Sequence, residues 1–365
     1  MLALEIQSME QNTSNTNSLL KIVRQLVRTI WVLVAMLIVV PILVYYAPDL
    51  VGIKSTQNSA DIDEQLVHGI SPEDTTWKAP PLSEIDDNIE LEKVSYGKEL
   101  IMHTAYYLGP NGVVQQTSNG LNCQNCHLDA GTKTFGNNYA SVASIYPKFR
   151  ARSGSIETLH KRINDCFERS LNGVALDTNS KEMQSIVAYM KFLGSHVPKG
   201  KQVLGSGFKD MAYLQRAADP ALGKIVYQAK CQSCHQENGE GVVAAHKREF
   251  SYPALWGNQS YNDGAGLYRM SNFAKYVKYN MPQGSDYEHT QLTDEEAWDV
   301  AAFVNSQPRP HYDISNDWPD ISKKPVDHPF GPYVDPFTEQ QHKYGPFKPI
   351  IEWYKKNQLI TASKK

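Results

Sequence analysis

The sequence of 365 residues contains only five cysteines and has no long runs of lysine or arginine. Its formal net charge is −3 at pH 7, whereas proteins that grip nucleic acid usually carry a basic patch or an arginine-rich arm. We therefore set nucleic-acid binding aside. Runs that alternate apolar and polar residues, which are typical of half-buried strands, are also lacking. The sequence predicts an all-α fold with long loops.

One long apolar run is present at residues 29–46, and it carries no charge. Its length is close to the roughly 20 residues that a helix needs to cross a bilayer. Basic residues precede the run and acidic residues follow it, which places the first residues in the cytoplasm. We predict a single-pass anchor in the inner membrane, with the rest of the chain in the periplasm. A cleaved secretory signal is the alternative, although no Ala-x-Ala-like site follows the run.

Beyond the apolar run, one pattern occurs twice. Each copy has a helical stretch, then a Cys-x-x-Cys-His motif, then an amphipathic closing helix, predicted at Met183–Leu193 and at Asp294–Asn305. Thr293 and Glu296 form the sequence of a capping box before the second closing helix. We predict this division: cytoplasmic segment 1–28, transmembrane anchor 29–46, linker 47–88, first domain 89–200, second domain 201–310 and C-terminal extension 311–365, extended and packed on the domains.

The repeated Cys-x-x-Cys-His motif is the attachment motif of c-type haem, in which both thiols bond the porphyrin and the histidine ligates iron. A thioredoxin-like pair would need a βαβ context, and a zinc site would not need a histidine after each cysteine pair. We predict two covalently bound haem c groups, which requires export of this part of the chain. The predicted attachment residues are Cys123, Cys126 and His127, and Cys231, Cys234 and His235, with the histidines as proximal ligands.

The distal ligands differ between the two copies. In the second copy we expect Met281, which lies between the haem motif and the closing helix, with Met270 as the competitor. The first copy has no methionine in the matching region, but it holds the fifth cysteine, Cys166. Thiolate ligation by Cys166 is our interpretation, and a buried structural cysteine with His160 as the ligand, or an open site, is the alternative.

Several arginines lie near Cys166 in the sequence. Such a group is often only a solvated face. Next to a thiolate on a haem, fixed guanidinium groups would suit a small dianionic oxyanion. The arginines are Arg150, Arg152, Arg162 and Arg169.

From about residue 96 to residue 349, the sequence resembles the dihaem c-type cytochromes of the thiosulfate dehydrogenase family, some of which act as tetrathionate reductases. The markers of this resemblance are Thr104–Tyr107, Cys126–Gly131, Arg150–Arg152, Arg162–Gly173, Tyr261–Gly266 and His342–Pro346.

The resemblance implies two class I cytochrome c domains in tandem that join two thiosulfates into tetrathionate. It implies that Cys166 ligates the active-site haem, that Arg152, Arg162 and Ser170 hold the substrate, and that electrons leave through a His/Met haem to a periplasmic or membrane-bound acceptor. A tetrathionate reductase and a membrane-anchored electron shuttle without a substrate are the alternatives. Asn280 stands where some relatives have a ligating lysine, and soluble relatives lack the membrane anchor.

Overall fold

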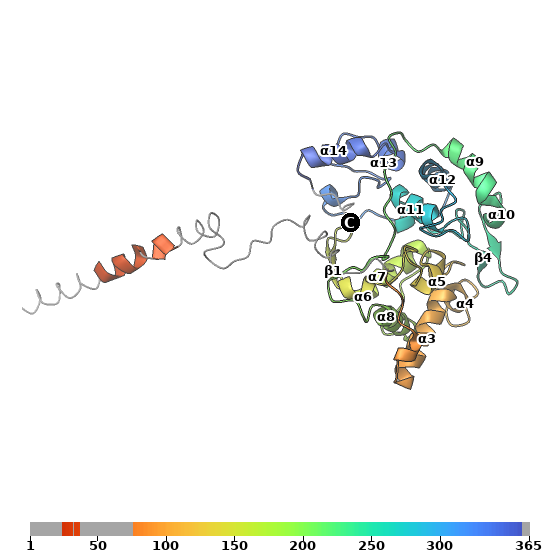
Figure 1. Ribbon diagram of the computed structural model, residues 1–365, viewed down its shortest axis with the longest axis horizontal. Helices are drawn as coiled ribbons and strands as arrows, with labels where there is room; N and C mark the ends of the chain where they lie inside the picture. The colour runs from red at the N-terminus through yellow and green to blue at the C-terminus, as the bar shows by residue number, and fades with distance from the viewer. Residues whose placement is uncertain (1–23, 32, 37–75, 360–365) are drawn as a thin grey trace, which may run out of the picture. The chain divides into compact units, whose positions relative to one another are not determined.

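The computed structural model describes residues 24–31, 33–36 and 76–359 (Figure 1). The chain divides into two units, Met1–Glu73 and Asp74–Lys365. In the first unit, residues 24–31 and 33–36 are helical. None of the helices in these described ranges is long and apolar enough to cross a membrane. Most of the predicted anchor, residues 29–46, lies outside the described residues, so the anchor stays a prediction.

The second unit is mostly helical and holds two hydrophobic cores. The elements of its first half are η2 (Leu82–Glu84), α3 (Asn88–Met102), α4 (Thr104–Leu108), η3 (Cys123–Asn125), α5 (Leu128–Gly131), α6 (Val142–Ile145), β1 (Lys148–Arg150), β2 (Ser155–Glu157), α7 (Leu159–Asp165), the π-helix η4 (Cys166–Ser170) and α8 (Lys181–Leu193). Those of its second half are α9 (Pro220–Lys230), α10 (Gln232–His235), β3 (Val242–Val243), β4 (Phe250–Tyr252), η5 (Gly266–Tyr268), α11 (Met270–Asn280), α12 (Asp294–Ser306), η6 (Ile321–Lys323), α13 (Glu339–Tyr344) and α14 (Lys348–Lys356).

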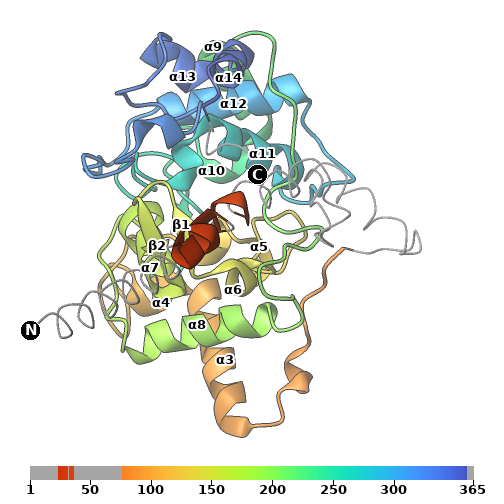
Figure 2. The same cartoon turned by 90° about the vertical axis from the view of Figure 1, so that its left-hand side faces the viewer.

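Each half is built on a crossing of its first long helix with its closing helix, α3 with α8 and α9 with α12 (Figure 2). A glycine permits each close approach. A Cβ atom added to Gly97 would lie 2.0 Å from the carbonyl oxygen of Ser185, and one added to Gly223 would lie 1.9 Å from that of Asp299. The glycine of Gly97-Lys98 and that of Gly223-Lys224 therefore meet the same packing requirement in the two halves.

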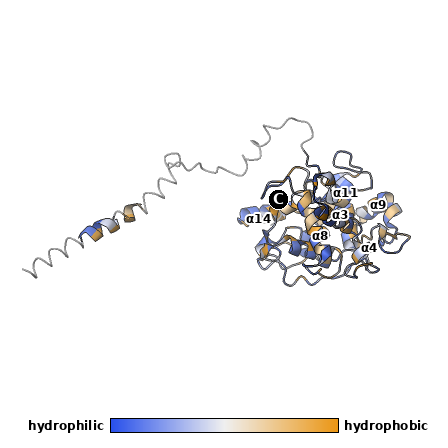
Figure 3. Ribbon diagram, turned by 90° about the horizontal axis from the view of Figure 1, so that it is seen from below, coloured by the Kyte–Doolittle hydropathy of each residue, from blue (hydrophilic) through white to orange (hydrophobic). Residues whose placement is uncertain are grey.

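The closing helices begin and end close to their predicted bounds. Ser180 caps α8, and Thr293 and Glu296 form the expected capping box at α12. Apolar residues line α8 (Figure 3), and Ile186 and Tyr189 are almost fully buried in the first core. The amphipathic pattern identified these helices because it extends over several turns.

The mostly helical structure fits the predicted class, but it differs from the prediction in two details. The chain also forms two antiparallel hairpins, β1–β2 and β3–β4, whose strands of two or three residues are too short to show an alternating pattern. The C-terminal extension is not extended throughout, because it contains α13 and α14. Thr338 caps α13, and Ile350 and Tyr354 of α14 are buried in the second core.

Candidate functional site

The two motif histidines are held in the same way. The Nδ1 atom of His127 lies 2.5 Å from the carbonyl oxygen of Asn137, and Nδ1 of His235 lies 2.8 Å from that of Pro253. A carbonyl oxygen can only accept, so Nδ1 carries the proton and Nε2 is left for a metal. Burial lowers the pKa of His127 to about 4 and also lowers that of His235. Both rings are therefore neutral, which is the form that ligates iron.

A cavity of about 850 Å³, part of it open to solvent, adjoins the first motif. It is lined by Cys123, Cys126 and His127, by apolar side chains, and by Tyr146. The Tyr146 hydroxyl is buried without a hydrogen-bond partner among the described residues, which suits a cavity that a polar-edged cofactor fills. These residues fit a covalently bound haem.

The second half also contains buried hydrogen-bond donors without acceptors among the described residues, as the first half does in the Tyr146 hydroxyl. The Nε and Nη1 atoms of Arg309 are buried and have no acceptor in the part of the chain that the structure describes. The guanidinium lies over the rings of Tyr261 and Tyr268, 4.3 and 5.0 Å from their centroids. A carboxylate of a haem would satisfy these donors. At the second motif, the histidine geometry itself fits the group, because the contact of His235 Nδ1 with Pro253 leaves Nε2 for iron.

Cys166 begins the π-helix that directly continues α7, and it lines the cavity of the first motif. Thr158 caps α7, and Arg162 lies one turn before Cys166 on the same helix face. The Nη1 atom of Arg162 donates to Cys166 Sγ at 2.9 Å. The charge of Cys166 is the main cause of the raised pKa of Arg162. The pair therefore holds a guanidinium donor directly against the sulfur. Single π-turns are frequent at functional sites.

A second cavity, of about 540 Å³, adjoins the first and shares Cys166 with it. We name it the anion pocket; its polar lining residues include Arg152, Arg162, Asp165, Cys166, Arg169, Ser170 and Asn272. Burial, and then the neighbouring arginines, lower the pKa of Arg152 to about 10. No carboxylate lies within 4.0 Å of the Arg152 guanidinium among the described residues. The pocket therefore presents positive charge beside the thiol.

The structure brings together the four residues that we predicted to be catalytic: Cys166, Arg152, Arg162 and Ser170 all line the anion pocket. Arg150 does not line it, and its Nε lies 3.9 Å from Glu157. His160, the alternative ligand, contacts Gln184 and lines neither cavity. This arrangement favours Cys166 over His160, although the roles themselves stay predictions.

The two candidate methionines of the second half lie at opposite ends of α11. Met270 begins the helix and is 2% exposed within the second core. Met281 directly follows the helix and is only partly buried against that core. A buried core position is the ordinary role of methionine. The assignment of Met281 as distal ligand stays a prediction.

The sequence did not reveal the residues that hold the π-helix from outside. Asn262 donates to the carbonyl oxygen of Glu168 at 2.9 Å and to Asn172 Oδ1 at 3.0 Å. Asp317 of the C-terminal extension binds Arg169. These contacts join segments about 90 to 150 residues apart. The Tyr261–Gly266 marker was the only signal in the sequence that pointed to any of them.

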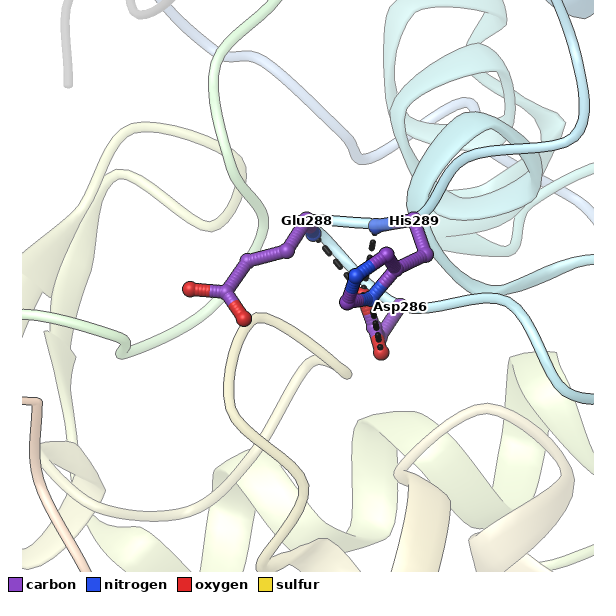
Figure 4. Close-up of side chains that lie close together, drawn as sticks. All are labelled: Asp286, Glu288 and His289. Carbon is purple, nitrogen blue, oxygen red and sulfur yellow. Dashed lines mark hydrogen bonds and ion pairs between the residues drawn. The ribbon is translucent and has the colours of Figure 1, made fainter.

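Another group of potential metal ligands lies on the loop after Met281 (Figure 4). It consists of Asp286, Glu288 and His289. Asp286 Oδ1 already accepts hydrogen bonds from the backbone N–H groups of Glu288 and His289, at 2.8 and 2.7 Å. The carboxylate therefore caps a turn, and we assign no metal to this exposed group.

Comparisons with known proteins agree with this site. Residues 114–198 match the family model "SoxA/TsdA, cytochrome c domain", and residues 220–308 match the model "Cytochrome c". The chain is therefore a c-type cytochrome with two cytochrome c domains and two covalently bound haem groups.

Similarity to curated proteins shows to which family of c-type cytochromes the chain belongs. A thiosulfate dehydrogenase of Allochromatium vinosum is 36% identical over 249 residues, which cover 67% of this chain and 88% of the relative. One of Psychrobacter arcticus is 38% identical, over 67% of this chain and 72% of the relative. The chain belongs to the thiosulfate dehydrogenase family and is an oxidoreductase.

A solved structure supports the same assignment. The thiosulfate dehydrogenase (TsdBA) of Marichromatium purpuratum superposes with a TM-score of 0.60 at 29% identity over 65% of this chain. The chain spans half the length of that solved protein.

Proposed function

We propose that this chain oxidises two thiosulfate ions to one tetrathionate ion at Cys166 and releases two electrons. The observation that carries the proposal is the contact of 2.9 Å between Arg162 Nη1 and Cys166 Sγ. The sulfur of this contact lines both the cavity of the first motif and the anion pocket. An electron shuttle needs no such pocket, so its presence favours an enzyme. The relatives' names favour the oxidative direction.

The arginines of the anion pocket would reduce the repulsion between the two thiosulfate ions. Two thiosulfate dianions repel each other strongly in a site with little water. Arg152 and Arg162 line the pocket and would offset this repulsion while orienting the two outer sulfur atoms. The Ser170 hydroxyl lines the same pocket and can donate to a sulfonate oxygen.

Cys166 acts as the nucleophile in this proposal. Its thiolate bonds the outer sulfur of one thiosulfate, giving a Cys-S-S-sulfonate adduct and two electrons. The outer sulfur of the second thiosulfate then attacks the adduct, which forms tetrathionate and restores the thiolate. Cys123, Cys126 and His127 would hold a haem that takes up these electrons one at a time, and Cys166 would be its distal ligand only while the sulfur is not bonded to substrate.

The second domain passes the electrons out. His235 and Met281 would hold its haem, and a Met/His ligand pair raises the potential and so suits an electron acceptor. A periplasmic or membrane-bound cytochrome or oxidase would then receive the electrons. We also propose that residues 29–46 anchor the protein in the inner membrane, because this run is uncharged and preceded by basic residues.

A direct assay tests the proposed reaction. Purified dihaem protein is mixed with thiosulfate and an artificial electron acceptor while the haem absorption bands are followed. We expect the haems to be reduced and one tetrathionate to form per two thiosulfates. Cys166→Ala should lose turnover by at least about a hundredfold while its mass still shows both haems attached. Full activity in this variant would rule out the mechanism.

A further inference from the structure

The C-terminal extension contacts two of the arginines that line the anion pocket. Arg169 Nη1 and Nη2 donate to the two carboxylate oxygens of Asp317, both at 2.7 Å. The backbone N–H of Trp318, the next residue, donates to the carbonyl oxygen of Arg152 at 2.7 Å. One short segment thus fixes both the side chain of Arg169 and the backbone of Arg152.

Arg169 is held on further sides as well. Its guanidinium lies 4.3 Å from the centroid of the Tyr312 ring, and its Nη1 lies 3.3 Å from the carbonyl oxygen of Gly264. The side chains of Arg169 and Asp317 are only 9% and 11% exposed. A Cβ atom at Gly264 would lie 3.0 Å from Nη1. The packing leaves Arg169 little freedom to turn toward a bound anion.

The charges around the pocket therefore divide into two groups. Asp317 neutralises Arg169, and Lys161 neutralises Asp165 with an Nζ–Oδ1 distance of 2.7 Å. Arg152 and Arg162 remain for the substrate, and Arg162 already faces the Cys166 sulfur. A third available guanidinium would bind substrate and product dianions alike, and uniform binding of this kind does not raise kcat.

We propose that Asp317 is a positioning residue that sets the charge of the anion pocket by withholding Arg169 from the bound anions. The inference rests on the proposed function, because it takes the pocket to be the thiosulfate site. The pocket then offers Arg152 and Arg162 to the two dianions, and Arg169 does not act as a third cation. The C-terminal extension is in this way part of the substrate site.

Sulfate, a dianion that cannot react, is the probe for the test. Its Kd for the oxidised dihaem protein is measured by calorimetry at constant ionic strength. In Asp317→Asn, Arg169 loses its counterion, and we expect sulfate to bind about tenfold more tightly, since an additional unit charge acts on a dianion at a low effective dielectric. The KM for thiosulfate should fall in parallel without a rise in kcat.

Two further variants make the result decisive. Arg169→Gln/Asp317→Asn removes both charges, should fold without an uncompensated buried charge, and should bind sulfate as the wild type does. Asp299→Asn removes the same charge from another bidentate pair, with Arg216 at 2.8 Å, and Asp299 does not line the pocket. Its sulfate affinity should not change.

Unchanged or weaker sulfate binding in Asp317→Asn, or a large loss of affinity in the double variant, would overturn the inference. Thiosulfate turnover by the wild type is scored separately. A wild type that turns over thiosulfate while Asp317→Asn leaves sulfate binding unaltered would refute only the role of Asp317. A wild type without thiosulfate turnover would refute the proposed function whatever the sulfate result.

Discussion

At the scale of single residues, the pair formed by Arg162 and Cys166 has one partner that donates and one that accepts. A guanidinium has no acceptor atoms, so the sulfur must take the hydrogen bond of 2.9 Å. The planar fork of arginine holds its position, whereas a lysine presents a flexible point charge. The function of the residue at position 162 therefore depends on the geometry of its side chain as well as on its charge.

We predict that Arg162→Lys lowers kcat for thiosulfate by about a hundredfold, because removal of one positioned donor typically costs about a hundredfold to a thousandfold and lysine keeps the charge. Arg150→Lys is the matched control, since Arg150 lines neither cavity. Its kcat should stay close to that of the wild type. Steady-state kinetics on the two purified variants decides the matter, and equal losses in both would contradict a special role for Arg162.

Residue-level features could be predicted where the chemistry is local in the sequence. The number of haem groups could be predicted because each Cys-x-x-Cys-His motif is contiguous in the sequence. The two matched cytochrome c domains confirm that number. Cys166 was identified as the thiol left over from the two motifs, and the structure places it on the shared wall of both cavities. Asp317 could not be found, because it lies 148 residues after its partner Arg169 and no local pattern marks it.

At the scale of elements, each half depends on a close crossing of two helices. The Cβ of an alanine at position 97 would overlap the backbone of α8, which is rigid, rather than the end of a flexible side chain. The long helices were predictable from their periodicity. The short hairpins β1–β2 and β3–β4 and the helices α13 and α14 were not, because tertiary contacts rather than sequence patterns define elements this short.

We predict that Gly97→Ala lowers the free energy of unfolding by about 1–3 kcal/mol or more, in spite of the better helix propensity of alanine. Denaturant unfolding followed by circular dichroism measures the change. Gly266→Ala is the matched control, because nothing lies within 4 Å of a Cβ atom there and its φ is not positive. A loss of stability at position 266 as large as that at position 97 would refute the steric explanation.

At the scale of the whole molecule, hydrogen bonds to the buried carboxylate of Asp327 hold the C-terminal extension against the second core. Asp327, which is fully buried, accepts from Arg269 Nη2 at 2.6 Å and from Ser271 N–H at 3.0 Å. Burial alone would raise the pKa of Asp327, but Arg269 and Ser271 outweigh it and the pKa is lowered. The carboxylate therefore stabilises the fold in its ionised form.

We predict that Asp327→Asn costs about 3–5 kcal/mol of unfolding free energy near neutral pH, because it leaves the Arg269 charge without its partner. The native pKa lies below the unfolded value, so this stabilisation is present above a pH of about 4 and is lost as the pH falls through the native pKa. The difference between wild type and variant should shrink in that range.

Unfolding curves at several pH values provide the measurement. Asp210→Asn serves as the control, since Asp210 is 79% exposed in its ion pair with Lys275 and such pairs contribute about 1 kcal/mol or less. A difference between wild type and Asp327→Asn that does not change between neutral pH and pH 3 would show that ionisation of Asp327 does not contribute.

The ligation of the first haem tests the account most directly. Electron paramagnetic resonance and near-infrared magnetic circular dichroism of the oxidised protein distinguish thiolate, thioether and imidazole ligands. We predict one low-spin haem with imidazole and thiolate ligands, whose signal disappears in Cys166→Ala, and one with imidazole and thioether. Two haems without a thiolate ligand would contradict the assignment of Cys166 and the reaction built on it.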